Sequence, residues 1–262
     1  MDTLPENIPA HVRNLLRSIT DGFEKALEGN LAGVYLHGSA AMGCFNPAKS
    51  DIDLLIVVHE KLSTEKKKEI IRFILLLADQ APQKGLELSV VTNEALQDFH
   101  YPTPYELHFS NAWKTAYLLD SVDYDKQRYD PDLAVHFAVT RKRGIRLYGK
   151  PVQSLFPDIP EEYYLRSIMG DAKDIFEGIT DNPVYGILNL CRVLAFLKEK
   201  AIYSKLEGGN WGIQHVTPAY RPLIQAALRA YQSVSGNDAA WDTGDLKAFA
   251  KHMKQQIQMA QP

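Results

Sequence analysis

The sequence predicts an α/β domain followed by an all-α domain. Strand-like and helix-like segments alternate over the first half of the chain, and the later periodic segments all have helical spacing. Between them, residues 148–160 hold three prolines and a glycine, which is typical of a domain boundary. A chain of 262 residues, 45% of them hydrophobic, can bury one or two cores. We therefore expect an N-terminal domain over residues 1–155 and a helical bundle over residues 156–262.

The N-terminal domain begins with an amphipathic helix. Over residues 8–27 the apolar side chains recur every three or four positions, which is the spacing of one buried helix face. Short apolar runs then predict three strands, at residues 31–36, 52–58 and 85–91. The second run is uninterrupted, so we expect that strand to be central in a sheet covered on both faces. Ser63 or Thr64 can cap a helix that runs to residue 78, between the second and third strands.

The rest of the chain is predicted to be helical after an irregular stretch. Residues 99–129 are rich in Tyr, Pro and His and show no clean period, so the sequence does not assign their secondary structure. Asp130 and Pro131 indicate the start of a helix that ends near Gly144. Helical spacing then recurs at residues 161–179, 183–200, 218–234 and 243–257.

Composition and charge exclude several classes of function. The chain has 29 Lys plus Arg against 32 Asp plus Glu, a net charge of −3, so no positive field favours nucleic acid as a partner. No apolar run approaches the roughly 20 residues of a membrane span, and we see neither an export signal nor an anchor. Cys44 and Cys191 match no zinc spacing and fit a reducing compartment. We expect a cytoplasmic monomer that acts on small molecules and binds no membrane.

The most informative residues are two aspartates at the start of the predicted second strand. Asp51 and Asp53 are two positions apart, so their side chains share one face of the strand while Ile52 points to the core. Two adjacent negative charges are costly unless they are neutralised. Mg²⁺ is a hard cation that prefers oxygen ligands and usually shares its coordination shell with substrate phosphates. The pair therefore predicts a magnesium site.

A glycine turn and a third carboxylate accompany this pair. Gly38 follows the first strand and allows a tight bend, after which a short helix starting near Ser39 would direct its N–H groups at a phosphate. The hydroxyls of Ser39 and Ser50 could donate hydrogen bonds to phosphate oxygens. Glu87, in the third predicted strand, has two open roles: a further metal ligand, or the general base that takes a proton from an attacking hydroxyl.

Each of these parts is common alone, but their order and spacing are specific. A strand, Gly38-Ser39, a gap of eleven residues and Asp51-x-Asp53 resemble the signature of the DNA polymerase β-like nucleotidyltransferase superfamily. Within it, the chain is similar to the aminoglycoside 3''(9)-adenylyltransferases. The similarity extends to Leu86-Glu87-Leu88, Trp113, Asp130-Pro-Asp-Leu133, Leu190-Cys191-Arg192, Ser204-Lys205 and Trp211. It implies a polymerase β-like mixed sheet with helices in the N-terminal domain and an all-α bundle after it.

The resemblance also implies the reaction and its residues. Asp51, Asp53 and Glu87 would be the catalytic set, with two Mg²⁺ ions held there and Glu87 acting as the base. ATP would be the co-substrate, bound by Gly38, Ser39, Ser50, Arg192, Lys205 and Tyr231. A triphosphate on an acidic protein needs Arg or Lys nearby to offset its charge, which agrees with the last group.

The implied second substrate is an aminocyclitol or aminoglycoside antibiotic, and the implied outcome is resistance to it. We expect spectinomycin, modified at position 9, ahead of streptomycin at position 3''. Family members that accept streptomycin tend to carry a Trp on the helix before the Leu-x-Arg segment, and residues 174–181 contain none. The candidate drug contacts are Trp113, Glu106, Glu177, Asp181, Asn182 and Tyr185. The family commonly has Phe or Tyr where this chain has His37, which we interpret as a packing variant; His100, His108 and His136 are assigned no role.

Two other functions stay open at this point. The chain could label a protein or another small molecule, as the minimal nucleotidyltransferase antitoxins label proteins, although these resemble only the first domain. It could instead be a nucleotide-binding sensor without catalysis, although a pure binder has no need of a third carboxylate. Drug-dependent pyrophosphate release separates the antibiotic-modifying enzyme from both.

Overall fold

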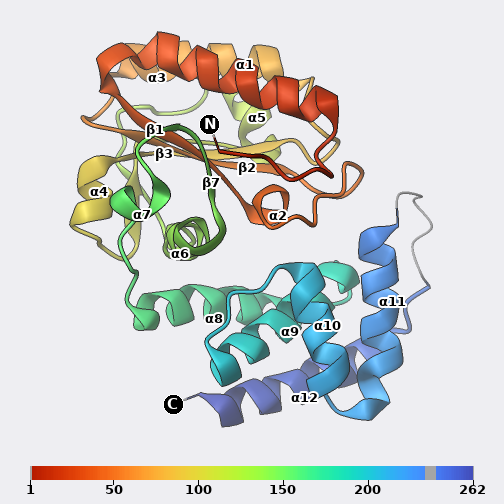
Figure 1. The fold of residues 1–262 in the computed structure, drawn as a ribbon. Helices are drawn as coiled ribbons and strands as arrows, with labels where there is room; N and C mark the ends of the chain where they lie inside the picture. The colour runs from red at the N-terminus through yellow and green to blue at the C-terminus, as the bar shows by residue number, and fades with distance from the viewer. Residues whose placement is uncertain (1, 234–239, 262) are drawn as a thin grey trace. The chain divides into compact units, whose positions relative to one another are not determined.

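The computed structural model describes residues 2–233 and 240–261. The chain divides into two compact units, Met1–Tyr164 and Leu165–Pro262 (Figure 1). Val152, Leu155 and Phe156 pack into a core of the first unit, so the proline-rich stretch expected to separate the domains is partly structured. The expected domain boundary after residue 155 stays a prediction.

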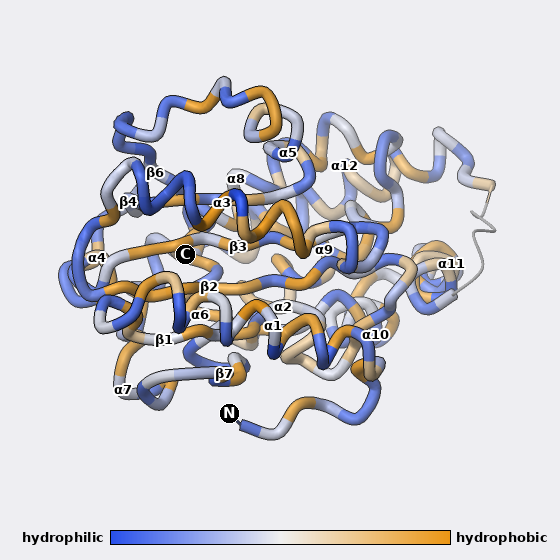
Figure 2. The backbone as a smooth tube through the Cα atoms, turned by 90° about the horizontal axis from the view of Figure 1, so that it is seen from above, coloured by the Kyte–Doolittle hydropathy of each residue, from blue (hydrophilic) through white to orange (hydrophobic). Residues whose placement is uncertain are grey.

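The first unit is built around a five-stranded mixed sheet with the order β5-β3-β2-β1-β7. Its strands are β1 (Leu31–His37), β2 (Ile52–Val58), β3 (Leu86–Thr92), β5 (Leu107–Phe109) and β7 (Ile145–Gly149). β2 and β3 are parallel, and all other neighbours are antiparallel. β2 lies in the centre, as its uninterrupted apolar run predicts, and Figure 2 shows hydrophobic colour along most of it. The three predicted strands and the α/β class are confirmed.

Helices cover both faces of this sheet (Figure 1). α1 (Ala10–Leu27) and α3 (Thr64–Ala78) pack on one face, where Leu15 and Ile70 share a core with Leu54 of β2. α6 (Leu133–Arg143) and α7 (Val152–Leu155) pack on the other face, where Phe137 shares a core with Leu55. The remaining elements of the unit are η1 (Glu28–Asn30), α2 (Gly38–Ala41), α4 (Asn93–Gln97), α5 (Asn111–Leu118) and a two-stranded sheet of β4 (Thr103–Tyr105) and β6 (Arg128–Asp130).

Two predicted helix starts have different outcomes. α3 begins after Ser63, whose hydroxyl accepts a hydrogen bond from the Lys66 N–H at 3.2 Å, so the expected cap is confirmed. The helix expected to begin at Pro131, after Asp130 as its cap, begins two residues later, at Leu133. Asp130 is instead the last residue of β6, and its carboxylate accepts the Asp132 N–H at 2.8 Å. The helix ends before Gly144 as expected.

The second unit is a bundle of five helices over its described residues. They are α8 (Glu161–Gly178), which starts in the first unit, α9 (Pro183–Glu199), α10 (Lys205–His215), α11 (Arg221–Gln232) and α12 (Thr243–Ala260), with a 3-10 turn, η2 (Pro218–Tyr220). α9 is central and contributes Leu190 and Leu194 to a core shared with Ile224 and Phe249. The all-α class is confirmed. Residue 234, the end of one expected helix, lies outside the described residues.

α10 was not predicted from the sequence. Ser204 caps it, and Glu207 completes a capping box by accepting the Ser204 N–H at 2.8 Å. In the described part of the chain, no helix combines the length and the apolar composition that a membrane crossing requires.

Candidate active site

Three carboxylates meet on one face of the central sheet. Asp51, Asp53 and Glu87 each offer an oxygen, and these oxygens all lie within 4.8 Å of one another. The strand register explains the meeting, because Asp53 of β2 pairs directly with Glu87 of the parallel strand β3. Asp51 lies two positions before Asp53 and so projects to the same side. The structure brings together the three residues proposed as metal ligands, and all three are half-buried.

The face that carries these carboxylates is the one covered by α6 and α7. Leu55 and Val57 alternate along β2 with residues that face the core on the other side of the sheet. They pack with Tyr35 in the core beneath α6 and α7. The polar end of the same row is Asp53, with His37 of β1 opposite it in the register. Apolar side chains therefore anchor the strand, and the carboxylates lie where the apolar row stops.

Gly38 is required by its close approach to Asp53. Its φ angle is +61°, which disfavours any residue with a Cβ. A Cβ built on Gly38 would lie 1.8 Å from Oδ2 of Asp53. The backbone of the turn thus lies directly against one of the three carboxylates.

The two serines differ in how their hydroxyls are used. The Ser39 Oγ is buried and has no hydrogen-bond partner among the described residues. A buried hydroxyl left unpaired costs about 1–3 kcal/mol, so this atom indicates an absent partner. The Ser50 Oγ accepts the Asn46 N–H at 3.1 Å, and the Ser50 N–H donates to the Asn46 carbonyl at 2.7 Å. Ser50 therefore stabilises the loop that leads into Asp51.

This set of residues fits Mg²⁺ and a phosphate. Three carboxylates supply the oxygen ligands that a hard cation prefers. The unpaired Ser39 hydroxyl offers a hydrogen-bond donor, and the absence of a side chain at Gly38 lets the Asp53 carboxylate lie against the turn.

Histidines lie around the carboxylates, and this placement was not predicted from the sequence. The His37 ring is buried, with its centroid 4.9 Å from that of His136 of α6. Burial, followed by the charge of His136, lowers the pKa of His37 well below its usual value. Nδ1 of His108 lies 3.0 Å from the Ser89 Oγ; burial lowers the pKa of His108, while the charges of Glu87 and Asp130 act to raise it. His108 sits between Leu107 and Phe109 in an apolar run, and this alternation is the signal that could have placed it on the carboxylate face.

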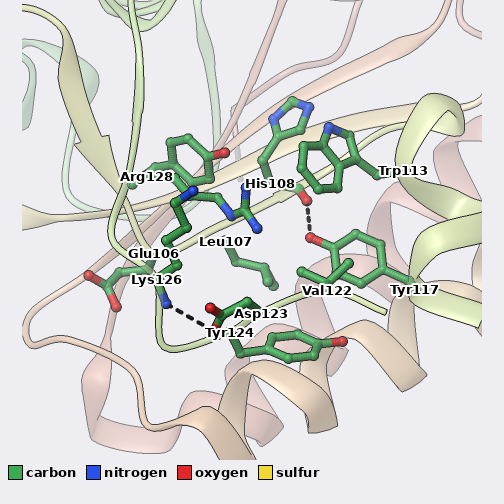
Figure 3. A pocket seen from close by; sticks show the side chains of 11 residues that line it. Glu106, Leu107, His108, Trp113, Tyr117, Val122, Asp123, Tyr124, Lys126 and Arg128 are labelled. Carbon is green, nitrogen blue, oxygen red and sulfur yellow. Dashed lines mark hydrogen bonds between the residues drawn. The ribbon is translucent and has the colours of Figure 1, made fainter. Parts of the chain in front are cut away.

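Trp113 lines a small pocket of the first unit (Figure 3). The guanidinium of Arg128 lies over the indole, 5.1 Å from the ring centroid. In the same pocket Glu106 is buried; its Oε2 accepts the Leu62 N–H at 3.0 Å and lies 3.3 Å from Nζ of Lys67. Glu106 already has partners in its own unit, and its role in drug binding stays a prediction.

Two of the site residues expected in the second unit lie on α9. Tyr185 and Arg192 are seven positions apart, which places them on one face of the helix. Nζ of Lys205 lies 4.9 Å from the centroid of the Tyr185 ring, so the structure brings these two together. Burial and the neighbouring Asp171 raise the pKa of Tyr185, whose hydroxyl donates to Asp171 at 2.8 Å.

The other expected contacts of this unit are more dispersed. Asn182 caps α9 by accepting the Tyr185 N–H at 3.4 Å. Glu177 and Asp181 are exposed near the end of α8. Tyr231 is buried in the bundle core. The roles of all these residues stay predictions.

The mixed sheet, with three carboxylates beside a Gly-Ser turn, defines a nucleotidyltransferase. The family model of the nucleotidyltransferase domain matches residues 16–106, which hold Asp51, Asp53 and Glu87. A second model, the C-terminal domain of aminoglycoside adenylyltransferases, matches residues 154–256. The chain thus combines a nucleotidyltransferase domain with a C-terminal domain of the aminoglycoside adenylyltransferase type, and the two together identify an aminoglycoside nucleotidyltransferase.

Individual relatives are similar over nearly their whole length. A spectinomycin 9-adenylyltransferase of Staphylococcus aureus is 26% identical over 257 residues, covering 96% of this chain and 95% of the relative. An aminoglycoside (3'')(9) adenylyltransferase of Escherichia coli is 24% identical over 269 residues, covering 96% and 97%. The crystal structure of an Enterococcus spectinomycin adenyltransferase, AAD(9), with ATP and spectinomycin shares the fold, with a TM-score of 0.79 at 22% identity over 94% of this chain and 99% of that one.

Proposed function

We propose that this enzyme transfers AMP from ATP to a hydroxyl of an aminocyclitol antibiotic and thereby confers resistance. Spectinomycin, modified at position 9, is the first substrate proposed, and streptomycin, modified at position 3'', is the second. The observation that carries the proposal is the meeting of Asp51, Asp53 and Glu87 beside the Gly38-Ser39 turn. Relatives named spectinomycin 9-adenylyltransferase, matched over 95% of their length, support the choice of substrate.

Asp51, Asp53 and Glu87 would hold Mg²⁺, which when bound offsets phosphate charge and stabilises the attacking and leaving oxygens. The Ser39 hydroxyl would donate to a phosphate oxygen and so gain the partner that it lacks. Glu87 would take the proton of the drug hydroxyl as its oxygen attacks the α-phosphorus of ATP. A bond forms between that oxygen and the α-phosphorus, the bond to the β-phosphate oxygen breaks, and pyrophosphate leaves.

The remaining nucleotide contacts are proposed on resemblance and on charge. Arg192 and Lys205 would offset the negative charge of the triphosphate, which a net acidic chain cannot do by its overall field. Tyr231 and the Gly38 backbone would also contact the nucleotide. Ser50, in the loop before Asp51, would donate its hydroxyl to a phosphate oxygen.

The proposed drug contacts combine two aromatic residues with acidic and polar groups. Glu177 and Asp181 are exposed and carry charges that could hold ammonium groups of the drug. Asn182, Tyr185 and Glu106 would add polar contacts. Trp113 would stack against the drug, and contact with the ring face that Arg128 covers requires the guanidinium to move.

Mass spectrometry tests the proposal directly. Purified protein incubated with ATP, Mg²⁺ and spectinomycin is expected to yield the AMP-drug adduct, and streptomycin in a parallel reaction tests the second substrate. Both reactions should stop when EDTA removes the divalent cation. If neither drug gains AMP while the protein still binds ATP, the proposed substrates are wrong. Transfer of AMP to a protein in the same assay would favour the protein-labelling alternative.

A further inference from the structure

A chain of hydrogen bonds links the polar residues on one face of α9 to α8. Asn189 is buried, with 4% of its surface exposed, and its side-chain amide is used in both directions. Its Oδ1 accepts from Nη1 of Arg192 at 2.7 Å, and its Nδ2 donates to Oδ2 of Asp171 at 3.1 Å. The other oxygen of Asp171 accepts the Tyr185 hydroxyl at 2.8 Å. Because both polar groups of this buried amide have hydrogen-bond partners, its orientation is fixed by the side chains around it.

The guanidinium of Arg192 is also held from two other directions. Its Nε donates to the carbonyl of Tyr203 at 2.7 Å. Its aliphatic part lies against α10, where a Cβ built on Gly208 would come within 2.4 Å of Cγ of Arg192. Because a guanidinium is planar, fixing Nε and Nη1 fixes the plane and leaves three of its five N–H donors to other partners.

We infer that Asn189 is a positioning residue for Arg192 and holds its guanidinium in the orientation that binds the triphosphate. The inference rests on the proposed function, in which Arg192 binds ATP. The amide suits this task because it accepts from the guanidinium and donates to Asp171 while carrying no charge of its own. A carboxylate at this position would pair directly with Arg192 and offset the positive charge that the nucleotide needs.

ATP affinity measured without drug tests this inference. We expect Asn189→Leu, which keeps the size but removes both hydrogen bonds, to weaken binding of a fluorescent ATP analogue about ten-fold in the presence of Mg²⁺. In steady-state assays the KM for ATP should rise while the KM for the drug and kcat stay within about three-fold, because the change concerns nucleotide binding alone. Cys191→Ala is the control, since Cys191 is buried in the same helix and takes no part in this network. Its ATP affinity should equal that of the wild type.

A double-mutant cycle separates positioning from a general packing role. If Asn189 acts through Arg192, adding Asn189→Leu to Arg192→Gln should cause no further loss of ATP affinity. Losses that multiply, or wild-type affinity in folded Asn189→Leu or in Arg192→Gln, would overturn the inference. If Asn189→Leu does not fold, Asp171→Ala replaces it. We expect Asp171→Ala to lower ATP affinity about three-fold, and to have no further effect when it is added to Arg192→Gln. Unchanged ATP affinity in Asp171→Ala would then overturn the inference.

The drug-free titration also distinguishes this inference from the proposed reaction. A protein that shows the expected cycle but adenylylates no antibiotic would contradict the proposed substrate and support the positioning role. If the wild type adenylylates spectinomycin and Asn189→Leu keeps normal ATP affinity, the proposed substrate is supported and the positioning role is contradicted.

Discussion

In the proposed reaction a single residue, Glu87, takes the proton of the drug hydroxyl. Glu87 pairs with Asp53 in the strand register, so it is placed both to bind metal and to act as a base. Glu87→Gln keeps the size of the side chain and removes its ability to take a proton. We expect turnover to fall by about 10²–10⁴-fold, because general-base catalysis contributes that much, with ATP affinity nearly unchanged. Single-turnover kinetics and an ATP titration measure the two quantities; equal losses in both would instead indicate that Glu87 acts mainly as a metal ligand.

Gly38 determines whether the carboxylate of Asp53 can keep its position. In Gly38→Ala the new Cβ would overlap Oδ2 of Asp53 at a positive φ angle, so the carboxylate must move. We expect loss of most activity together with about 1–2 kcal/mol of stability. Gly43→Ala is the matched control, because Gly43 also has a positive φ, of +73°, but meets nothing within 4 Å. It should lose similar stability, measured by urea unfolding, and keep its activity; equal activity in both variants would contradict the role of Gly38.

His37 makes stability depend on pH. Its pKa is lowered in the folded protein, so below about pH 6.5 the unfolded chain binds more protons and stability falls as the pH falls. His37→Phe removes this effect, because Phe keeps a planar ring and has no titratable group. We expect the wild type to lose up to about 1.4 kcal/mol more per pH unit than His37→Phe between pH 6 and 5. Urea unfolding at pH 8, 6 and 5 measures it, and parallel curves for the two proteins would exclude the effect.

At the scale of elements, buried segments with one clear period were predictable and short or glycine-rich ones were not. β2 is mostly apolar and β3 places Glu87 between two leucines, so both strands could be predicted, and with them the meeting of Asp51, Asp53 and Glu87. β7 is short and half-exposed, so its residues resembled a linker. The helix expected at Asp130 starts later because Asp130 is the last residue of β6, a short strand that the local sequence does not predict.

α10 was missed because two adjacent glycines, Gly208 and Gly209, disfavour a helix when only propensity is considered. The structure gives the reason for the second one. A Cβ on Gly209 would lie 2.6 Å from Leu228 and 2.7 Å from Leu188, so the small residue allows α10 to approach α9 and α11 closely. Packing thus outweighs propensity, and the capping box at Ser204 was the available signal.

A pair of glycine variants tests this interpretation. Gly209→Ala should destabilise the protein by about 1–3 kcal/mol, because the added methyl overpacks the bundle core. Gly170→Ala, in α8, meets nothing within 4 Å and should stabilise the protein by about 0.5–1 kcal/mol through helix propensity. Thermal unfolding of both variants compares them, and the same sign of change in both would contradict the packing argument.

At the scale of the whole molecule, the family follows from the order of a few motifs, while the contacts around them do not. The two models match both ends of the chain, and the α/β and all-α classes were expected from periodicity. Three contacts could not be predicted in this way: the tilted ring contact of His37 with His136, the guanidinium of Arg128 over Trp113, and the amide of Asn189 between Arg192 and Asp171. They join segments through side-chain geometry, which depends on packing and leaves no pattern in the sequence.

The central claim is that three carboxylates, on β2, on β3 and in the loop before β2, hold Mg²⁺ for the transfer of AMP to an aminocyclitol. Pyrophosphate release measures this most directly. We predict that the wild type releases pyrophosphate from ATP only when Mg²⁺ and spectinomycin are both present. Asp53→Asn should lower that rate by at least about a hundred-fold, because it removes one of the charges that bind the cation. Drug-dependent release that survives in Asp53→Asn at the wild-type rate would contradict the account.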